Sequence, residues 1–168
     1  SDAGIMGGTE VGGKVYFYPD QTVSRSEFIV MAMTAAGISD LPACSATVFA
    51  DDGDIPASAK PYIGAAYKLG ICDGWIKDGK QCFLPDEAVS VAEAAVITAG
   101  LLEIKTDGAT AAWCDDGGVP AWASAGFGTM KAAGFVGTVP ASGARSGLDR
   151  RTCAVLMAAI MRYSAAKK

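Results

Sequence analysis

Two arginines of this sequence stand where an anion could bind at the start of a helix. Arg25 lies between Ser24 and Glu27, and Arg150 directly follows Asp149. Serine and aspartate are preferred helix N-caps, so a helix is expected to begin at each arginine. A cation in the first helical turn opposes the helix dipole, whereas a carboxylate ligand there would meet amide donors and the guanidinium fork. The alternative is an intramolecular salt bridge to a nearby acid.

The other reactive side chains exclude several kinds of catalytic and metal site. The sequence has no histidine, and its five cysteines show no CxxC spacing. Ser-His and Cys-His pairs and the usual zinc ligand sets are therefore absent. Cys72 and Cys82 flank a Gly- and Asp-rich loop and could form a disulfide, but sequence spacing does not fix the geometry. We interpret Cys44, Cys114 and Cys153 as free buried thiols.

The acidic residues suggest two further hypotheses, calcium binding and glycoside hydrolysis. The clusters at 51–54 and 115–117 lack the ligand spacing and terminal acid of an EF-hand, so we interpret them as turns and helix caps. Paired carboxylates can cleave glycans, but helix capping already accounts for Glu27 and Glu93. We therefore predict no metal site, no cofactor and no enzymatic activity.

Composition narrows the class of partner. The net charge is −4 and the pI is about 4.7, which argues against binding to nucleic acid. No apolar run of about 18 residues could insert into a membrane. The first residues lack the features of a signal peptide, so an export signal would have to lie upstream. The 51% apolar content, much of it in small residues, favours close-packed helices in one domain, 1–168.

Internal repetition indicates how the chain is organised. The segments 49–57 and 113–121 share an aromatic residue, an Asp-Asp-Gly turn and a helix start. The segments 17–27 and 83–93 share a Phe-x-Pro-Asp element followed by a helix start, and 148–152 is a looser copy. We predict a partial repeat at 1–40 and further repeats at 41–104 and 105–168. The first repeat lacks its outer helix, so we expect a segment of a larger protein.

Each repeat predicts an inner helix. Ser24 with Glu27, and Ser90 with Glu93, fit the S-x-x-E capping box, whereas Asp149 caps a third helix in which threonine replaces the acid. The segments that follow, 28–36, 94–102 and 153–161, are apolar almost all round. Helices of this kind belong inside a bundle, so we expect these three at the centre.

A second helix type is expected outside the central three. It begins near Ala57 and Ala121, and lysines leave one side polar. Its apolar residues are Tyr62, Ile63, Ala66, Tyr67 and Leu69 in one copy and Trp122, Ala125, Met130 and Ala133 in the other. Asp-Gly, Gly-Gly and Pro-Asp pairs mark the turns. With no substantial sheet indicated, the predicted fold class is all-α.

These ordered motifs resemble the S-layer homology (SLH) family. The aromatic-x-Asp turn stands at 49–51, the Gly-Ile-x-x-Gly turn at 70–74, the Phe-x-Pro-Asp element at 83–86, and the Thr-Arg-Ala-Glu-like helix start at 24–27. The resemblance covers almost the whole chain. It implies a pseudo-threefold helical spindle with three central helices, outer helices, long turn-rich loops and grooves between repeats.

The resemblance also implies ligand-binding residues. The family's helix-start arginine, which helps bind an acidic glycan, carries over to Arg25 and to Arg150, whereas Val91 replaces it in the middle copy and should weaken that groove. Trp75 takes the place of an aromatic groove residue, with a packing lid over the turn as the alternative. Asp73 could accept hydrogen bonds from sugar hydroxyls. Trp122 matches a family aromatic, although we favour interhelical packing for it.

The function implied is noncatalytic. We expect a module that binds a cell-wall polysaccharide, such as a secondary polymer with pyruvylated amino sugars, and anchors a secreted protein to the bacterial surface. The alternative is a structural module for self-assembly or protein interaction, which would use an exposed apolar patch.

Overall fold

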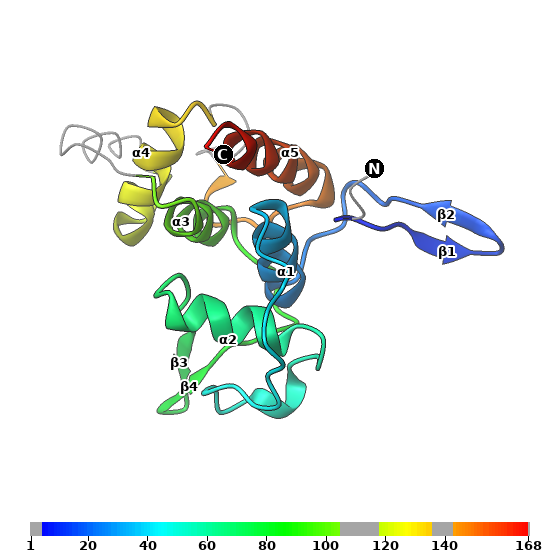
Figure 1. Ribbon diagram of the computed structural model, residues 1–168, viewed down its shortest axis with the longest axis vertical. Coiled ribbons are helices and arrows are strands. Elements are labelled where there is room, and N and C mark those ends of the chain that lie inside the picture. Colours follow the sequence, from blue (N-terminus) through cyan, green and yellow to red (C-terminus); the bar gives the residue numbers. More distant parts are fainter. Residues whose placement is uncertain (1–4, 105–117, 136–142, 168) are drawn as a thin grey trace.

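The computed structural model describes residues 5–104, 118–135 and 143–167. They form five α-helices, two 3₁₀ turns and two two-stranded hairpins (Figure 1). The helices are α1 (Arg25–Ala35), α2 (Lys60–Lys68), α3 (Val91–Leu101), α4 (Ser124–Ala132) and α5 (Arg150–Ala166). The 3₁₀ turns are η1 (Asp52–Asp54) and η3 (Ala121–Ala123). Among the described residues, no helix is both long and apolar enough to cross a bilayer.

The starts of α1, α3 and α5 are joined by a closed ring of backbone hydrogen bonds. The amide of Val23 donates to the carbonyl of Leu148 at 2.9 Å, Leu148 donates to Val89 at 2.8 Å, and Val89 donates back to Val23 at 3.0 Å. The first residue of each helix continues the pattern, with Arg25 donating to Glu87, Val91 to Ser146 and Arg150 to Gln21. All three ring residues are fully buried. Three segments far apart in the sequence therefore converge at one point.

The predicted helix caps are confirmed. The hydroxyl groups of Ser24 and Ser90 accept from the backbone amides of Glu27 and Glu93, and the carboxylate of each glutamate accepts from the amide of the capping serine. Asp149 caps α5 by accepting from the amide of Thr152 at 2.7 Å. Each inner helix thus begins where local side chains satisfy its free amides.

Two of the three inner helices are buried as predicted. Almost every turn of α1 and α3 contributes side chains to the core. The fully buried ones include Phe28, Ile29, Ala94 and Ala95. The prediction is wrong for α5, because Val155 is 47% exposed and Met161 is 38% exposed. Only one face of α5, with Cys153, Leu156, Met157 and Ile160, packs inward. Its outward face carries charged residues such as Arg151 and Arg162.

The outer helices contact the inner ones, with α2 against α1 and α4 against α3. α2 buries Ile63 and Ala66, as expected, but Leu69 is 61% exposed. Leu69 caps the C-terminal end of α2, beyond the turn that faces the core. Helices α3 and α4 approach closely at Gly126, where an added Cβ would come within 2.9 Å of Val96.

Two hairpins correct the prediction of a purely helical fold. Strands β1 (Thr9–Val11) and β2 (Lys14–Tyr16) are antiparallel, as are β3 (Trp75–Lys77) and β4 (Lys80–Cys82). The linking pairs, Gly12-Gly13 and Asp78-Gly79, all have positive φ, as the two-residue turns of hairpins require. Hairpin β3–β4 lies beside α2, whereas β1–β2 extends away from the helices (Figure 1).

Candidate functional site

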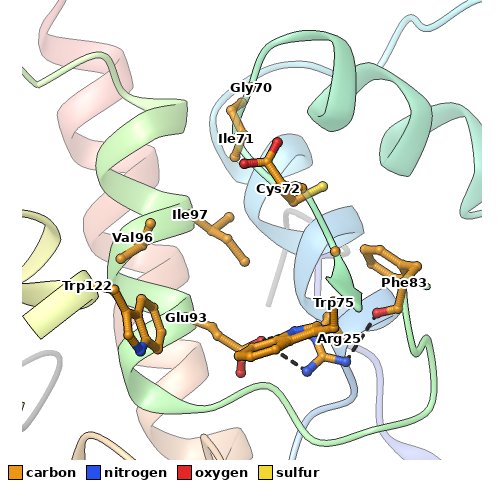
Figure 2. Close-up of a pocket in the computed structure, with 12 residues that line it drawn as sticks. Arg25, Gly70, Ile71, Cys72, Trp75, Phe83, Glu93, Val96, Ile97 and Trp122 are labelled. Carbon is orange, nitrogen blue, oxygen red and sulfur yellow. Dashed lines mark hydrogen bonds and ion pairs between the residues drawn. The ribbon is translucent and has the colours of Figure 1, made fainter. Parts of the chain in front are cut away.

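A groove gathers four of the five side chains that sequence predicts to bind ligand. Its volume is about 340 Å³, and Arg25, Asp73, Trp75 and Trp122 all line it. They come from four places in the chain: the start of α1, the loop before β3, β3 itself and η3. Val96 and Ile97 of α3 and Ile71 add apolar lining (Figure 2). The groove therefore combines an apolar wall, two indoles and charged groups.

Arg25 is held by an intramolecular network inside this groove. Its Nε and Nη2 atoms each lie 3.0 Å from Oε1 of Glu93. Its Nη1 donates to the carbonyls of Phe83 at 3.1 Å and Leu84 at 2.8 Å. The arginine and glutamate side chains are only 8% and 12% exposed. The salt-bridge alternative for Arg25 is thus the arrangement in the structure.

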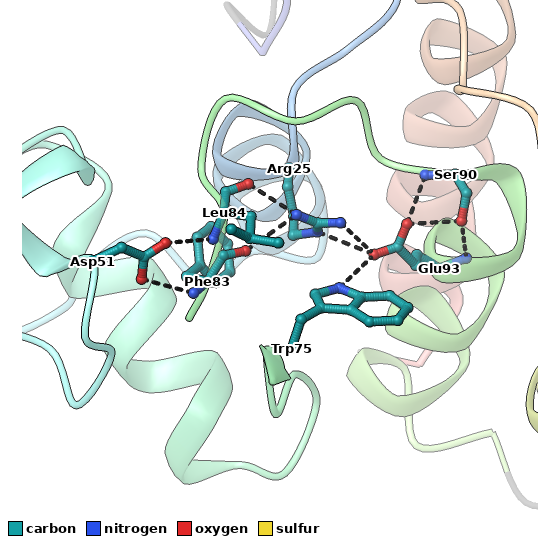
Figure 3. A network of polar contacts seen from close by, with 7 residues as sticks. All are labelled: Arg25, Asp51, Trp75, Phe83, Leu84, Ser90 and Glu93. Carbon is teal, nitrogen blue, oxygen red and sulfur yellow. Dashed lines mark hydrogen bonds and ion pairs between the residues drawn. The ribbon is translucent and has the colours of Figure 1, made fainter. Parts of the chain in front are cut away.

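The same two-residue segment is held from its other side by Asp51. The amides of Phe83 and Leu84 donate to the Asp51 carboxylate at 2.8 Å and 2.7 Å (Figure 3). Leu84 has a φ of 59°, a left-handed conformation that costs about 1–2 kcal/mol for a residue with a side chain. Asp51 was expected to form a turn or cap, and it makes no side-chain cap bond to η1. Its carboxylate instead helps to hold this strained loop.

Glu93 is the groove residue whose second role the sequence analysis missed. Its Oε2 atom has only the capping role, because it accepts from the amide and hydroxyl of Ser90. Its Oε1 atom faces the groove and accepts from Arg25 and, at 3.2 Å, from Nε1 of Trp75. The sequence feature that could have pointed to this second role is the position of Glu93 in the second repeat, which matches that of Glu27 in the first.

The two tryptophans present much of their surface to solvent. Trp75 is 44% exposed and Trp122 is 54% exposed, and in Figure 2 their rings lie on either side of Glu93. The Arg25 guanidinium lies 5.8 Å from the centre of the Trp75 ring. Trp122 lies on η3, which contacts α3 and α4, and its half-exposed side chain also borders the groove. Exposed indoles of this kind can cover the apolar face of a sugar ring.

Cys72 lies in the same groove, and both it and Cys82 are free thiols in the structure, so the suggested disulfide is not formed. Burial, and then the nearby charge of Asp73, raises the pKa of Cys72 from 9.0 to about 12. Burial likewise raises the pKa of Cys153 to about 12. These two thiols stay protonated near neutral pH and are poor nucleophiles. Cys44 is a free, half-buried thiol, and Cys114 lies outside the described residues.

Arg150 lines a second groove of about 410 Å³, separate from the first. The guanidinium group donates to the carbonyls of Phe17 and Gly7, and it lies 5.1 Å from the Phe17 ring centre. Glu27 and Thr9 line the same groove. The structure therefore does not bring Arg150 together with the other four predicted residues.

The middle copy offers no equivalent cation. Val91 is 4% exposed and sits at the first position of α3, where α1 and α5 each have an arginine. An apolar side chain at this position has no donor to offer to a carboxylate.

Three further aspartates make structural contacts or lie in turns. Asp52 accepts from the amide and hydroxyl of Thr47 and pairs with Lys60 at 2.6 Å. Asp20 lies in a turn, and its carboxylate pairs with Arg151 at 2.9 Å on the surface. Asp86 lies in the equivalent turn of the next repeat. Within the described residues, no cluster of three or more potential ligand side chains could hold a metal ion. The 115–117 cluster lies outside them.

No protein-family model fits the chain, and no curated protein sequence aligns with it significantly. The repeats and the two grooves are therefore the features that point to a function.

Proposed function

We propose that this chain is a noncatalytic SLH-type module that binds a cell-wall polysaccharide and anchors a secreted protein to the bacterial surface. The observation that carries the proposal is the first groove. Sequence motifs alone selected Arg25, Asp73, Trp75 and Trp122, and these four side chains line one hollow. Its volume is within the range of small-ligand sites, and a saccharide can use both the indole faces and the polar groups around them.

The arrangement of the helices supports the same proposal. The ring through Val23, Val89 and Leu148 relates three equivalent chain segments in turn, which is the connectivity that a pseudo-threefold spindle requires. The two grooves also fall at equivalent places in the repeats. Each is bordered by the helix-start arginine of one copy and the capping glutamate of the next copy in cyclic order, Arg25 with Glu93 and Arg150 with Glu27. We propose repeats at 1–40, 41–104 and 105–168 on this basis.

The first test is co-sedimentation of the protein with purified cell walls, before and after chemical removal of their secondary polymers. We expect binding to native walls and its loss after removal. Trp75→Ala should weaken binding about 3- to 10-fold, the effect of losing one aromatic contact. Trp75 is the better probe than Arg25, because replacing a buried, paired arginine would also disturb the fold.

The matched control is Ile76→Ala. Ile76 is the next residue of β3, is 75% exposed and does not line the groove. Its replacement should leave wall binding unchanged, with folding of both variants checked by circular dichroism. No binding to native walls, or an equal effect of the two substitutions, would reject anchoring through this groove.

One observation favours self-association as a second candidate function. Hairpin β1–β2 carries several large exposed apolar side chains, among them Val11 at 51%, Val15 at 72% and Tyr16 at 43%. An isolated two-stranded hairpin with open edges is a ready template for pairing with another chain. Concentration-dependent association without glycan, measured by sedimentation velocity and abolished by Val15→Lys, would support this function. A monomer at all concentrations would exclude it.

A further inference from the structure

The two grooves have equivalent positions in the fold but different charges around them. The first contains one guanidinium, from Arg25, and two carboxylates, from Glu93 and Asp73. The second contains one guanidinium, from Arg150, and one carboxylate, from Glu27. In the second groove Gly7 stands in the place of Asp73, as the repeat alignment shows. The first groove therefore has an excess negative charge that the second lacks.

The guanidinium of the first groove is already neutralised. Glu93 meets two nitrogen atoms of Arg25 at 3.0 Å, and the third nitrogen is bonded to two carbonyls. A ligand carboxylate would have to displace Glu93 from a nearly buried pair, or approach beside two carboxylates. Both routes are unfavourable, because breaking a buried ion pair leaves an uncompensated charge and like charges repel.

Among the described residues, the guanidinium of the second groove has no such partner. There Arg150 donates to two backbone carbonyls, and no carboxylate lies within 4.0 Å of it. Glu27 lines the groove, but its Oε2 atom accepts from the amide of Ser24 rather than from Arg150. Carbonyl dipoles orient the guanidinium without cancelling its charge, so an anion can still be attracted to it.

The two grooves also differ in their aromatic residues, and this difference favours an uncharged ligand in the first groove. The first groove is bordered by two indoles, Trp75 and Trp122, whereas the matching positions of the second groove are Thr9 and Ser58. Indole faces gain most from the apolar face of an uncharged sugar ring. Hydroxyl-bearing side chains beside a free guanidinium are better suited to a carboxylate.

We propose that the two grooves divide the glycan between them: the Arg25 groove takes an uncharged sugar, and the Arg150 groove takes a sugar that carries a carboxylate. This inference rests on the proposed glycan-binding function and assigns a ligand class to each groove. The polymer would then be recognised at two places, one that prefers an uncharged sugar and one that prefers an acidic sugar. The arginine that matches the family motif best is, on this view, not the one that binds the acid.

The test uses two sugars that share one ring, N-acetylglucosamine and N-acetylmuramic acid; the second adds a lactyl ether, which carries the carboxylate. Binding is followed by NMR titration of the full chain. The indole N–H signals of Trp75 and Trp122 report on the first groove, and the backbone amides of Gly7 and Thr9 report on the second. Assignments of the indole signals come from Trp75→Phe and Trp122→Phe.

In the first groove we expect the neutral sugar to bind about fivefold more tightly than the acidic one, and in the second groove the reverse. Glu93→Gln should raise the first groove's affinity for the acidic sugar about fivefold, because it removes the neutralising charge. A glutamine can still complete the capping box, so α3 should stay folded. The matched control is Glu27→Gln, the same change at the equivalent helix position, which should leave the first groove unchanged. Arg150→Gln should abolish the second groove's preference for the acid.

The acidic sugar preferred in the first groove of the unaltered protein would overturn the inference, as would no shift at either groove at the highest soluble concentrations. If the protein binds walls while both grooves prefer the same sugar, the division of ligands between the grooves is refuted and anchoring stands. Walls that do not bind, with the grooves behaving as expected, would instead refute anchoring and leave the division standing.

Discussion

At the scale of single residues, the Arg25–Glu93 pair determines how the first groove is built. The pair joins α1 to α3 and also supports the strained loop at Leu84 through two carbonyl contacts. We expect Arg25→Met to lower the free energy of unfolding by about 3 kcal/mol, because Glu93 is left charged and nearly buried. Adding Glu93→Gln should recover part of that loss.

Urea denaturation followed by circular dichroism measures both effects. The control is Arg150→Met, at the equivalent and more exposed position, which leaves no carboxylate partner behind among the described residues and should cost clearly less. Equal losses for Arg25→Met alone and for the double variant would show that the unpaired charge of Glu93 is not what destabilises the single variant.

Asp52 should make stability depend on acid pH. Its hydrogen bond from Lys60, and then those from Thr47, lower its pKa from 3.8 to about 2. A carboxyl group whose pKa is lowered in the folded state stabilises the protein above its unfolded pKa and loses that contribution as the pH falls through the folded pKa. The contribution should therefore be complete above about pH 4 and be lost between about pH 4 and pH 2.

Urea midpoints measured at pH 5 and pH 2 test this. Asp52→Asn should remove part of the difference between the two midpoints, whereas Asp54→Asn, at the exposed end of the same 3₁₀ turn, should not. An unchanged difference in Asp52→Asn would contradict the role given to this carboxylate.

At the scale of elements, the contact between α3 and α4 sets the width of the first groove, because Trp122 lies on the turn that leads into α4. Gly126→Ala would place a Cβ within 2.9 Å of a Val96 methyl and 3.0 Å of its Cα. We expect a loss of about 1–3 kcal/mol from this overpacking, together with weaker binding at the groove.

Gly64→Ala, on α2, is the matched control. Its added Cβ would meet only the sulfur of Cys44 at 3.4 Å, an ordinary contact. Because alanine is the better helix former by about 1 kcal/mol, this variant should be as stable as the unaltered protein or more so. Thermal unfolding of the two variants separates the effect of packing from that of helix propensity. Equal melting temperatures would show that α4 moves aside without cost.

Local signals explain which elements could be predicted from sequence. A capping box needs only the residues from Ser24 to Glu27, so the starts of α1 and α3 could be located without knowledge of the fold. The hairpins were missed because their strands are three residues long and show no apolar alternation. Their turn pairs, Gly12-Gly13 and Asp78-Gly79, were interpreted as turns between helices. The exposed face of α5 was missed because its alanines suggested burial from composition alone.

The site was predictable to the extent that it follows the repeats. The motifs shared with the SLH family selected Arg25, Asp73, Trp75 and Trp122, but they do not give the rotation of one helix about another. Glu93 lies 68 positions from Arg25, and only the packing of α1 beside α3 brings their charges together. The neutralisation of Arg25 follows from that contact and could not be obtained from sequence, whereas the exchange of Asp73 and Trp75 for Gly7 and Thr9 can be read from the repeats.

At the scale of the whole molecule, the ring of hydrogen bonds should make the described helices unfold together. Each of Val23, Val89 and Leu148 needs the other two segments to complete its bonds. We expect their amides to exchange with solvent deuterium at one common rate, that of global unfolding. Hydrogen exchange measured by NMR tests this, with the amide of Gly12, in the exposed turn between β1 and β2, as a fast-exchanging reference. Faster exchange at Leu148 alone would mean that α5 detaches independently.

The ring also determines how the molecule would respond to mechanical force. Thr22 and Asp149 face each other in antiparallel orientation, so tension between residues 5 and 167 pulls on the same end of that bridge. Such a load peels the contact open bond by bond instead of shearing all its bonds at once. A load that enters at one terminus and is resisted by a polymer in the first groove passes instead through the Arg25–Glu93 pair and the helices beside it. The direction of pulling, and not only its strength, would then decide where the module yields first.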